Sequence, residues 1–257
     1  MEVEWRRLRA DQLREAAAED ALVILPVASI EQHGPHLPVE TDTMIGGAVA
    51  IRTARAIAAR GGRALVLPVL WTGLSEHHMP FGGTITLSLG AFSAVIEDIC
   101  RSLVRHGFRR IALSNSHGGN VSALRTVTDD LTVKLKVPIV LFTYAEAVQP
   151  VIAKLLTTQG GVRHACEAET AIMLALRPDL VATDRIPPRA NAEPETSSGL
   201  YRWRSFAERT KTGVMGNPDA ASAEQGERLL EAIAEALAAK LTSPELWVWR
   251  ETTDPSP

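Results

Sequence analysis

The sequence contains little cysteine and no stretch that resembles a secretion signal. Cys100 and Cys166 are the only two cysteines among 257 residues, which is too few for a disulfide framework and typical of a reducing compartment. The first residues, MEVEWRRLRADQLREAAAEDA, are charged and follow a helical pattern without an apolar centre, unlike a signal peptide. We therefore expect a cytoplasmic protein in which both thiols are packing residues.

Long apolar runs, basic clusters and phosphate-binding motifs are also missing. The longest apolar runs have the length of a strand, so no membrane-spanning helix is expected. The 27 basic and 30 acidic residues give a formal net charge of -3 without any basic run, which argues against nucleic acid or an anionic membrane as a partner. Neither G-x-G-x-x-G nor a Walker sequence occurs, which argues against a nucleotide site. The expected partner is a small molecule.

The size and composition are those of an ordinary globular domain. Hydrophobic residues make up 46% and charged residues 22% of the chain, and there is no internal repeat or low-complexity tract. A length of 257 residues lies near the upper size for one hydrophobic core. We expect one domain that spans residues 1–257.

Strand-like apolar runs alternate with amphipathic helical stretches along most of the chain. The expected strands cover 21–29, 64–70, 110–115 and 138–144; the expected helices cover 43–60, 90–106, 119–135, the segment ETAIMLALRP, and a last helix that begins near Asp219. This alternation predicts an α/β fold, a three-layer sandwich whose mostly parallel sheet lies between helices. In such sheets ligands bind beyond the carboxyl ends of the strands.

The first expected strand is followed directly by five acidic and imidazole side chains. They are Glu31, His33, His36, Glu40 and Asp42, in the segment SIEQHGPHLPVETD. Carboxylates mixed with imidazoles are typical ligands of divalent cations. Glu31 and His33 leave the same face if the strand continues, and the glycine and prolines that follow can turn the chain so that Asp42 returns over that face. This segment is the expected centre of the chemistry.

Three further polar segments follow later strands or precede a helix. In SNSHGGN, a metal ligand is the favoured interpretation of His117, and Gly118 and Gly119 let the backbone approach a ligand closely. In HACEAE, the helix dipole accounts for one of the two glutamates, Glu167 and Glu169, but does not account for His164. In SEHH, adjacent histidines point to different sides, so we expect only one of them, His77, to reach the site.

These motifs resemble the creatininase (creatinine amidohydrolase) family. The string EQHGPHLP followed by TD, the later SHGGN and the HACEAET segment carry the resemblance, which extends from Leu25 to about Leu180. The resemblance implies an α/β fold of creatininase type and a metal-dependent amidohydrolase, usually a hexamer. It also implies two divalent ions per subunit (Zn, Mn or Fe) at the strand ends.

The resemblance also assigns roles to individual residues. Glu31, Asp42 and His117 would hold one ion; His33, Asp42 and a glutamate would hold the other, with Asp42 bridging. Creatinine-hydrolysing members supply that glutamate at the position of Gly119, so we assign it here to Glu167, with Glu169 as the alternative. His164 would give a proton to the departing nitrogen, and His36 would order the loop. The expected substrate-binding residues are His77, Gly118, Gly119 and Asn120.

The substrate is less narrowly defined by the sequence. Creatinine-hydrolysing members use tryptophans beside the substrate, and this chain has none between Trp71 and Trp203. We expect hydrolysis of another small cyclic amide or formamide; the alternatives are a peptidase of mycofactocin-type maturation and a non-catalytic ligand-binding protein on the same fold. The Pro- and Gly-rich stretch from about Ile186 to Asp219 is expected to form a lid or a subunit contact.

Overall fold

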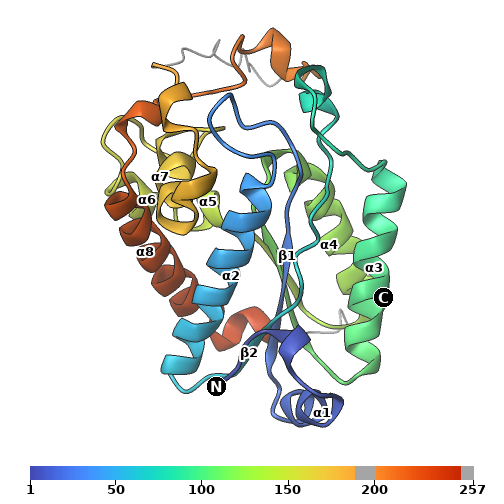
Figure 1. Ribbon diagram of the computed structural model, residues 1–257. Coiled ribbons are helices and arrows are strands. Elements are labelled where there is room, and N and C mark those ends of the chain that lie inside the picture. The colour runs from blue at the N-terminus through green and yellow to red at the C-terminus, as the bar shows by residue number, and fades with distance from the viewer. Residues whose placement is uncertain (189–200, 250–257) are drawn as a thin grey trace, which may run out of the picture.

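The computed structural model describes residues 1–188 and 201–249. Its centre is a four-stranded sheet in the order β2-β1-β3-β4 in which all neighbouring strands are parallel (Figure 1). The strands are β1 (Leu22–Val27), β2 (Ala64–Val66), β3 (Arg110–Asn115) and β4 (Ile139–Thr143). β1 therefore lies between β2 and β3, with Leu22 in register with both Ala64 and Arg110.

Helices cover both faces of this sheet. On one face lie α2 (Thr41–Ala59), α5 (Tyr144–Ala147), α6 (Gln149–Ala153), α7 (Glu167–Leu176) and α8 (Ala223–Leu241); on the other lie α1 (Ala10–Ala18), α3 (Leu89–Arg105) and α4 (Val121–Leu135). Alternate residues of β1 pack into two separate cores, Leu22 and Ile24 into one, Val23 and Leu25 into the other. A strand buried on both faces explains the continuous apolar run LVILPV, and the predicted three-layer α/β fold is confirmed.

Short 3-10 helices connect these elements. They are η1 (Trp5–Arg7), η2 (Glu76–Phe81), η3 (Gly118–Asn120), η4 (Pro178–Leu180), η5 (Thr183–Arg185), η6 (Phe206–Glu208), η7 (Pro218–Ala220) and η8 (Pro244–Trp247). Within residues 1–188 and 201–249, no helix has the length and apolar character needed to cross a membrane.

Two element boundaries differ by more than two residues from the sequence-based expectation. The second strand ends at Val66 rather than Leu70, because Pro68 has no N–H to continue the ladder; the chain meets β1 again only in an isolated bridge between Val27 and Leu70. The last helix begins at Ala223, after a 3-10 turn and a cap by Ser222, whose hydroxyl accepts from the Gln225 backbone N–H.

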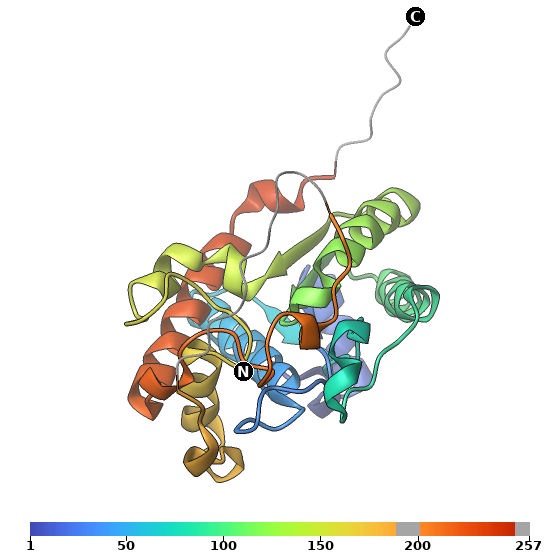
Figure 2. The ribbon, with the colours of Figure 1, turned by 90° about the horizontal axis from the view of Figure 1, so that it is seen from above.

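The carboxyl ends of the strands lie at one end of the molecule. Figure 2, which looks down on this end, shows the loops after β1 and β2 gathered beneath the segment that carries η6. The loops are tied together by Asn120, whose amide donates to Ala28 O and accepts from the Leu74 N–H. Three strand ends are thereby fixed around one location, where the predicted ligands lie.

The packing of α7 on α8 generates a stability prediction. Gly226 of α8 lies so close to α7 that a Cβ would be 1.9 Å from Ala171 O. Gly226→Ala should therefore separate the helices and lower the free energy of unfolding by about 1–3 kcal/mol, measured by urea unfolding. Gly90→Ala in α3 is the matched control, since no atom lies within 4 Å of its Cβ position, and it should raise stability slightly. Equal effects in both variants would contradict this packing.

Candidate metal centre

Glu31 and His33 follow β1, and Asp42 lies in the first turn of α2. The chain between them reverses at Gly34, whose φ of +66° lies in the left-handed region that glycine adopts readily. The Glu31 N–H donates to Val39 O at 3.0 Å and closes this loop. The turn predicted from the sequence is therefore present, and it returns Asp42 to the face that carries Glu31 and His33.

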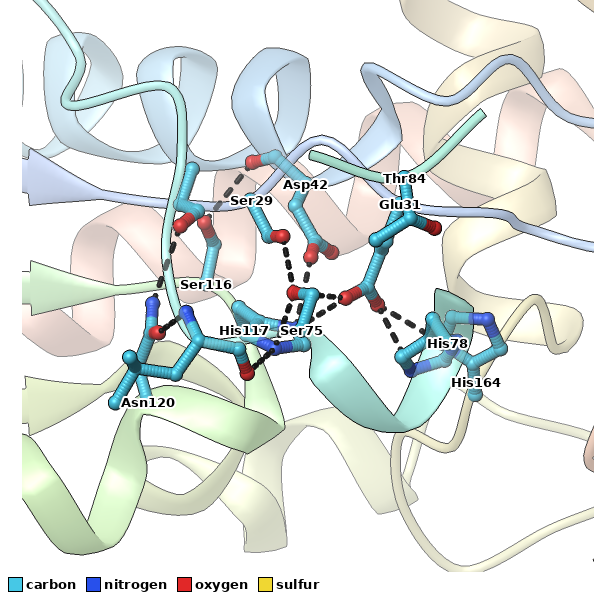
Figure 3. Close-up of polar contacts among 12 residues, drawn as sticks. Ser29, Glu31, Asp42, Ser75, His78, Thr84, Ser116, His117, Asn120 and His164 are labelled. Carbon is cyan, nitrogen blue, oxygen red and sulfur yellow. Dashed lines mark hydrogen bonds and ion pairs between the residues drawn. The ribbon is translucent and has the colours of Figure 1, made fainter. Parts of the chain in front are cut away.

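The first ligand group consists of Glu31, Asp42 and His117 (Figure 3). His117 follows β3, and its Nδ1 lies 3.0 Å from Glu31 Oε2 and 3.1 Å from Asp42 Oδ2. All three side chains are buried, each with an exposed fraction of 3% or less. Three of the predicted ligands, which are far apart in the sequence, therefore share one buried location.

The second ligand group lies on the other side of Asp42. His33 Nε2 is 3.4 Å from Asp42 Oδ1 and 3.8 Å from Glu169 Oε2. The two carboxylate oxygens of Asp42 thus face different groups, the arrangement expected of a bridging ligand. Glu169 reaches this position from the first turn of α7.

The assignment of Glu167 as the fifth ligand needs correction. Its carboxylate accepts hydrogen bonds from Thr157, Thr158 and Gln225, including Thr157 N at 2.7 Å and Gln225 Nε2 at 2.7 Å. Two residues apart on a helix of 3.6 residues per turn, Glu167 and Glu169 point in nearly opposite directions. Glu169, the alternative, is the glutamate beside His33, whereas Glu167 anchors the 157–158 turn.

Three imidazoles each direct one ring nitrogen at a backbone carbonyl. The contacts are His33 Nδ1 to Glu31 O at 3.1 Å, His117 Nε2 to Leu74 O at 3.2 Å, and His164 Nε2 to Gln32 O at 2.8 Å. Because a carbonyl can only accept, each of these nitrogens carries the hydrogen. The other nitrogen of each ring faces the carboxylates and is the one that a cation would bind, as in protein metal sites where the second ring nitrogen is hydrogen-bonded outward.

The donor set fits divalent cations. His33 Nε2 is buried without a hydrogen-bond partner. The separations of 3.0 to 3.8 Å within the groups bracket the roughly 3.4 Å between neighbouring ligands of a tetrahedral ion bound at about 2.1 Å. The carboxylates also favour positive charge at this location. Burial alone would lower the pKa of His33, but the nearby Asp42, Glu169 and Glu31 raise it to about 9. Burial, together with Asp42 and Glu31, raises the pKa of Glu169 to about 8.

Both histidines of the SEHH segment lie at the site, so the expectation that only His77 would reach it is wrong. His78 is buried and its Nε2 is 3.4 Å from Glu31 Oε1. His77 is half-buried, with its ring stacked 5.7 Å from that of His117. The alternation argument failed because these residues lie in the 3-10 helix η2 rather than in a strand.

The residues predicted to bind substrate in SHGGN occupy different environments. Asn120 is completely buried and its amide is used to join loops. A Cβ on Gly119 would lie 2.4 Å from His117 Nε2, whereas Gly118 is exposed with open space around it. The structure thus places Asn120 in the packing between loops, and the substrate-binding role predicted for it stays a prediction.

His36 lies behind the ligands. Its Nε2 contacts Thr170 Oγ1 at 2.9 Å, and its backbone carbonyl accepts from the Ala182 N–H. Burial and the charge of His33 lower the pKa of His36 to about 4, so the ring is neutral. These contacts agree with the predicted role in ordering the loop.

Two further polar residues at the site, Ser75 of the SEHH segment and Gln32, were given no role by the sequence analysis. Ser75 Oγ lies 2.8 Å from Glu31 Oε2 and 3.0 Å from His117 Nε2. Gln32 Nε2 lies 2.9 Å from His78 Nδ1. Serine and glutamine are common everywhere, so their only sequence signal was adjacency to the predicted ligands.

Residues 201–218 belong to the predicted lid or subunit contact, while 189–200 lie outside the described residues. The described part covers the histidines. Phe206 stacks on His78 with ring centres 4.2 Å apart and meets His164 edge-on at 4.7 Å. The Met215 N–H donates to His164 O at 2.8 Å. This segment therefore forms one wall of the site.

Buried carboxylates and imidazoles at the carboxyl edge of a parallel α/β sheet form a candidate metal centre in the place where such folds bind ligands. The profile of the Creatininase family, described as creatinine amidohydrolase, matches residues 6–241. The chain belongs to this family of amidohydrolases, as the sequence motifs predicted.

Relatives and solved structures agree with this membership. A mycofactocin precursor peptide peptidase of Mycobacterium ulcerans (strain Agy99) is 34% identical over 217 residues, which cover 80% of this chain and 79% of the relative. Creatinine amidohydrolase of Pseudomonas putida is 31% identical over 255 residues, 92% of this chain and 93% of the relative. The structure titled "Creatininase Mn" has a TM-score of 0.80 at 28% identity and covers 94% of this chain and 98% of that one. A "Zn-Zn type" creatininase mutant has a TM-score of 0.79 at 29% identity, with 94% and 97% covered.

The two glutamates of α7 provide a matched test of the ligand assignment. Glu169→Gln should reduce bound metal by about one ion per chain, because a neutral amide is a weak ligand. Glu167→Gln should keep its metal but lower the free energy of unfolding by about 1–3 kcal/mol, since it loses charge-assisted hydrogen bonds. Elemental analysis and urea unfolding measure the two effects. Loss of metal from Glu167→Gln alone would reverse the assignment.

Proposed function

We propose that this protein is a dinuclear metal-dependent amidohydrolase that cleaves the C–N bond of a small cyclic amide or formamide. The observation that carries the proposal is the position of Asp42, whose two oxygens face two separate ligand groups. Glu31, Asp42 and His117 would hold one ion, and His33, Asp42 and Glu169 the other. When bound, such ions lower the pKa of a water molecule and polarise an amide carbonyl.

The two metals named in the titles of similar structures, manganese and zinc, support Zn or Mn as the resident ions, with Fe as a further candidate. Nitrogen and oxygen ligands of this kind accept all three. A non-catalytic role on the same fold is disfavoured, because a complete set of candidate ligands is present in the described residues.

In this proposal His164 moves the proton. Its Nε2–H is held by Gln32 O, so the unprotonated Nδ1 faces Glu31 Oε1 at 3.5 Å. Burial, with the charge of His33, keeps the pKa of His164 well below its usual value, so the ring begins as a proton acceptor. Nδ1 takes the proton of the attacking water as the C–O bond forms, and returns it to the nitrogen as the C–N bond breaks.

At two positions, this site differs from the sites of family members that hydrolyse creatinine. The glutamate that creatinine-hydrolysing members place after their histidine is replaced here by Gly119, where a Cβ would lie 2.4 Å from His117 Nε2. The aromatic ring beside the catalytic imidazoles is that of Phe206, while Trp71 and Trp203 are 48% and 53% exposed. A small amide other than creatinine therefore suits this site.

Peptide cleavage is the second candidate function. The observation in its favour is that the mycofactocin precursor peptide peptidase of Mycobacterium ulcerans is at least as similar in sequence as the creatinine amidohydrolase, with 34% against 31% identity. A peptidase would use the same ligands and the same His164. Only the shape of the substrate would differ.

The remaining expectations also enter as proposals. We propose that residues 1–257 form one domain, that the subunits assemble as a homohexamer, and that the protein acts in the cytoplasm. The family profile supports the first of these, since its match extends over residues 6–241. Two buried free thiols agree with a reducing compartment.

Metal removal tests the proposed function directly. Protein purified without added metal should contain about two ions per chain, following two-metal hydrolases, and chelation should abolish hydrolysis of a panel of cyclic amides, formamides and short peptides. Added zinc or manganese should restore it. The panel also separates the amidase from the peptidase. Full activity in a metal-stripped sample, verified by elemental analysis, would refute the mechanism.

Substitutions should separate metal binding from proton transfer. Glu31→Gln and His117→Ala should lose both bound metal and turnover. His164→Gln should keep its metal and lower kcat by about 100-fold to 10,000-fold, the usual contribution of general acid–base catalysis. Steady-state kinetics with elemental analysis of each variant measures this. A His164→Gln enzyme with normal kcat would exclude His164 as the proton carrier.

A further inference from the structure

The side chain of Gln32 lies between two histidines and the segment that covers them. Its Oε1 accepts from the Gly34 N–H at 2.9 Å, which fixes the orientation of the amide. Nε2 then faces three neighbours: Gly213 O at 3.2 Å, His78 Nδ1 at 2.9 Å and His164 Nε2 at 3.0 Å. Two hydrogens on this nitrogen must be divided among three neighbours.

Which neighbours receive the two hydrogens of Gln32 Nε2 depends on which of them can accept a hydrogen bond. Gly213 O can only accept, so it takes one hydrogen. His164 Nε2 already carries a hydrogen, which it donates to Gln32 O at 2.8 Å, so it cannot accept another. The second amide hydrogen therefore goes to His78 Nδ1. A ring whose Nδ1 accepts a hydrogen bond carries its own hydrogen on Nε2.

We propose that Gln32 is a positioning residue that holds His78 as a hydrogen-bond donor through Nε2 and His164 as an acceptor through Nδ1. Both atoms face the same carboxylate oxygen, Glu31 Oε1, at 3.4 and 3.5 Å (Figure 3). Only His78 has a hydrogen to give to that oxygen. His164 keeps its lone pair for the proton that hydrolysis moves, and in this one respect the inference rests on the proposed function.

The same arrangement decides what the group formed by Glu31, His78 and His164 can bind. Its ligand atoms have spacings that suit a third cation. A ring nitrogen that carries a hydrogen has no lone pair for a cation, however. His78 therefore contributes a hydrogen bond to Glu31 instead of a ligand, and this group is kept out of metal binding.

The covering segment holds the rings and the amide together. Gly213 has a φ of +77°, and a Cβ there would lie 2.0 Å from Gln32 Oε1, so this close approach requires glycine. From the same segment, Phe206 stacks on His78 with ring centres 4.2 Å apart. The tautomers of both histidines are therefore coupled to the placement of residues 205–215.

Nitrogen-15 NMR of the full-length protein with labelled histidine tests this proposal, because protonated and unprotonated ring nitrogens resonate in separate regions. Spectra are recorded on protein as purified and after addition of zinc, which is diamagnetic, and assigned with His78→Gln and His164→Gln. His78 and His164 should each show an unprotonated Nδ1 and a protonated Nε2. Protonation of His78 Nδ1 in the wild type would overturn the proposal, as would a zinc ion bound to His78.

The variant Gln32→Glu tests whether the Gln32 amide determines the tautomer of His78. A carboxylate can only accept, so His78 Nδ1 should become protonated, and kcat should fall about 100-fold with KM nearly unchanged. Gln159→Glu is the matched control: its amide contacts Gly161 O and the Asn217 N–H, with no histidine, and it should change neither the spectrum nor kcat. An unchanged His78 signal in Gln32→Glu, or an equal loss of kcat in the control, would refute the role of Gln32.

If Gln32→Glu does not fold, Gln32→Met provides the second variant. It removes the hydrogen bond while keeping the length of the side chain, and the His78 signals should then show both tautomers. Retention of one tautomer would count against the proposal. The NMR readout requires no substrate, so a confirmed tautomer without hydrolysis of any amide would refute the proposed function and leave this inference intact.

Discussion

The site depends on the burial of three carboxylates, those of Glu31, Asp42 and Glu169, around imidazoles. Such a concentration of negative charge away from water is costly unless positive charge accompanies it. The fold supplies part of the compensation, because Asp42 and Glu169 lie in the first turns of α2 and α7, where the helix dipole favours negative charge. His33 and His117 supply another part and keep the pKa of Asp42 low despite its burial. The remaining requirement for positive charge is what makes the cluster suitable for divalent ions.

The topology of the sheet explains why these groups can meet. With β1 between β2 and β3, the loops that follow these three strands leave the same edge of the sheet beside one another. Each contributes side chains, Glu31 and His33 after β1, His78 after β2 and His117 after β3. Helix α7 packs against α2 and α8 on one face and adds Glu169 from the side. Backbone hydrogen bonds then fix the orientation of the rings, so the geometry does not depend on exposed, mobile side chains.

The division of tasks among the imidazoles follows from their hydrogen-bond partners. His33 and His117 have outward N–H groups bound to carbonyls, which leaves their inward nitrogens as the atoms that a cation would bind in place of a proton. The Nε2–H of His164 is likewise bound to a carbonyl, and its Nδ1 faces Glu31 Oε1, beside His78. Identical side chains thus acquire different roles from single neighbouring atoms, and Gln32 provides two of these atoms, its backbone O and its Nε2.

The sequence by itself determined the alternation of strands and helices, the family, and most members of the candidate ligand cluster. These follow from local information: the apolar periodicity of each element, and motifs such as EQHGPHLP in which ligands lie within a few residues of a strand end. Only the tertiary structure placed Glu169 rather than Glu167 beside His33, brought His78 to Glu31, and put Asn120 between packed loops. Those outcomes depend on the rotation of α7 about its axis, on the 3-10 path of η2 and on contacts between distant loops. They are set by packing between segments far apart in the chain, which no local pattern of residues records.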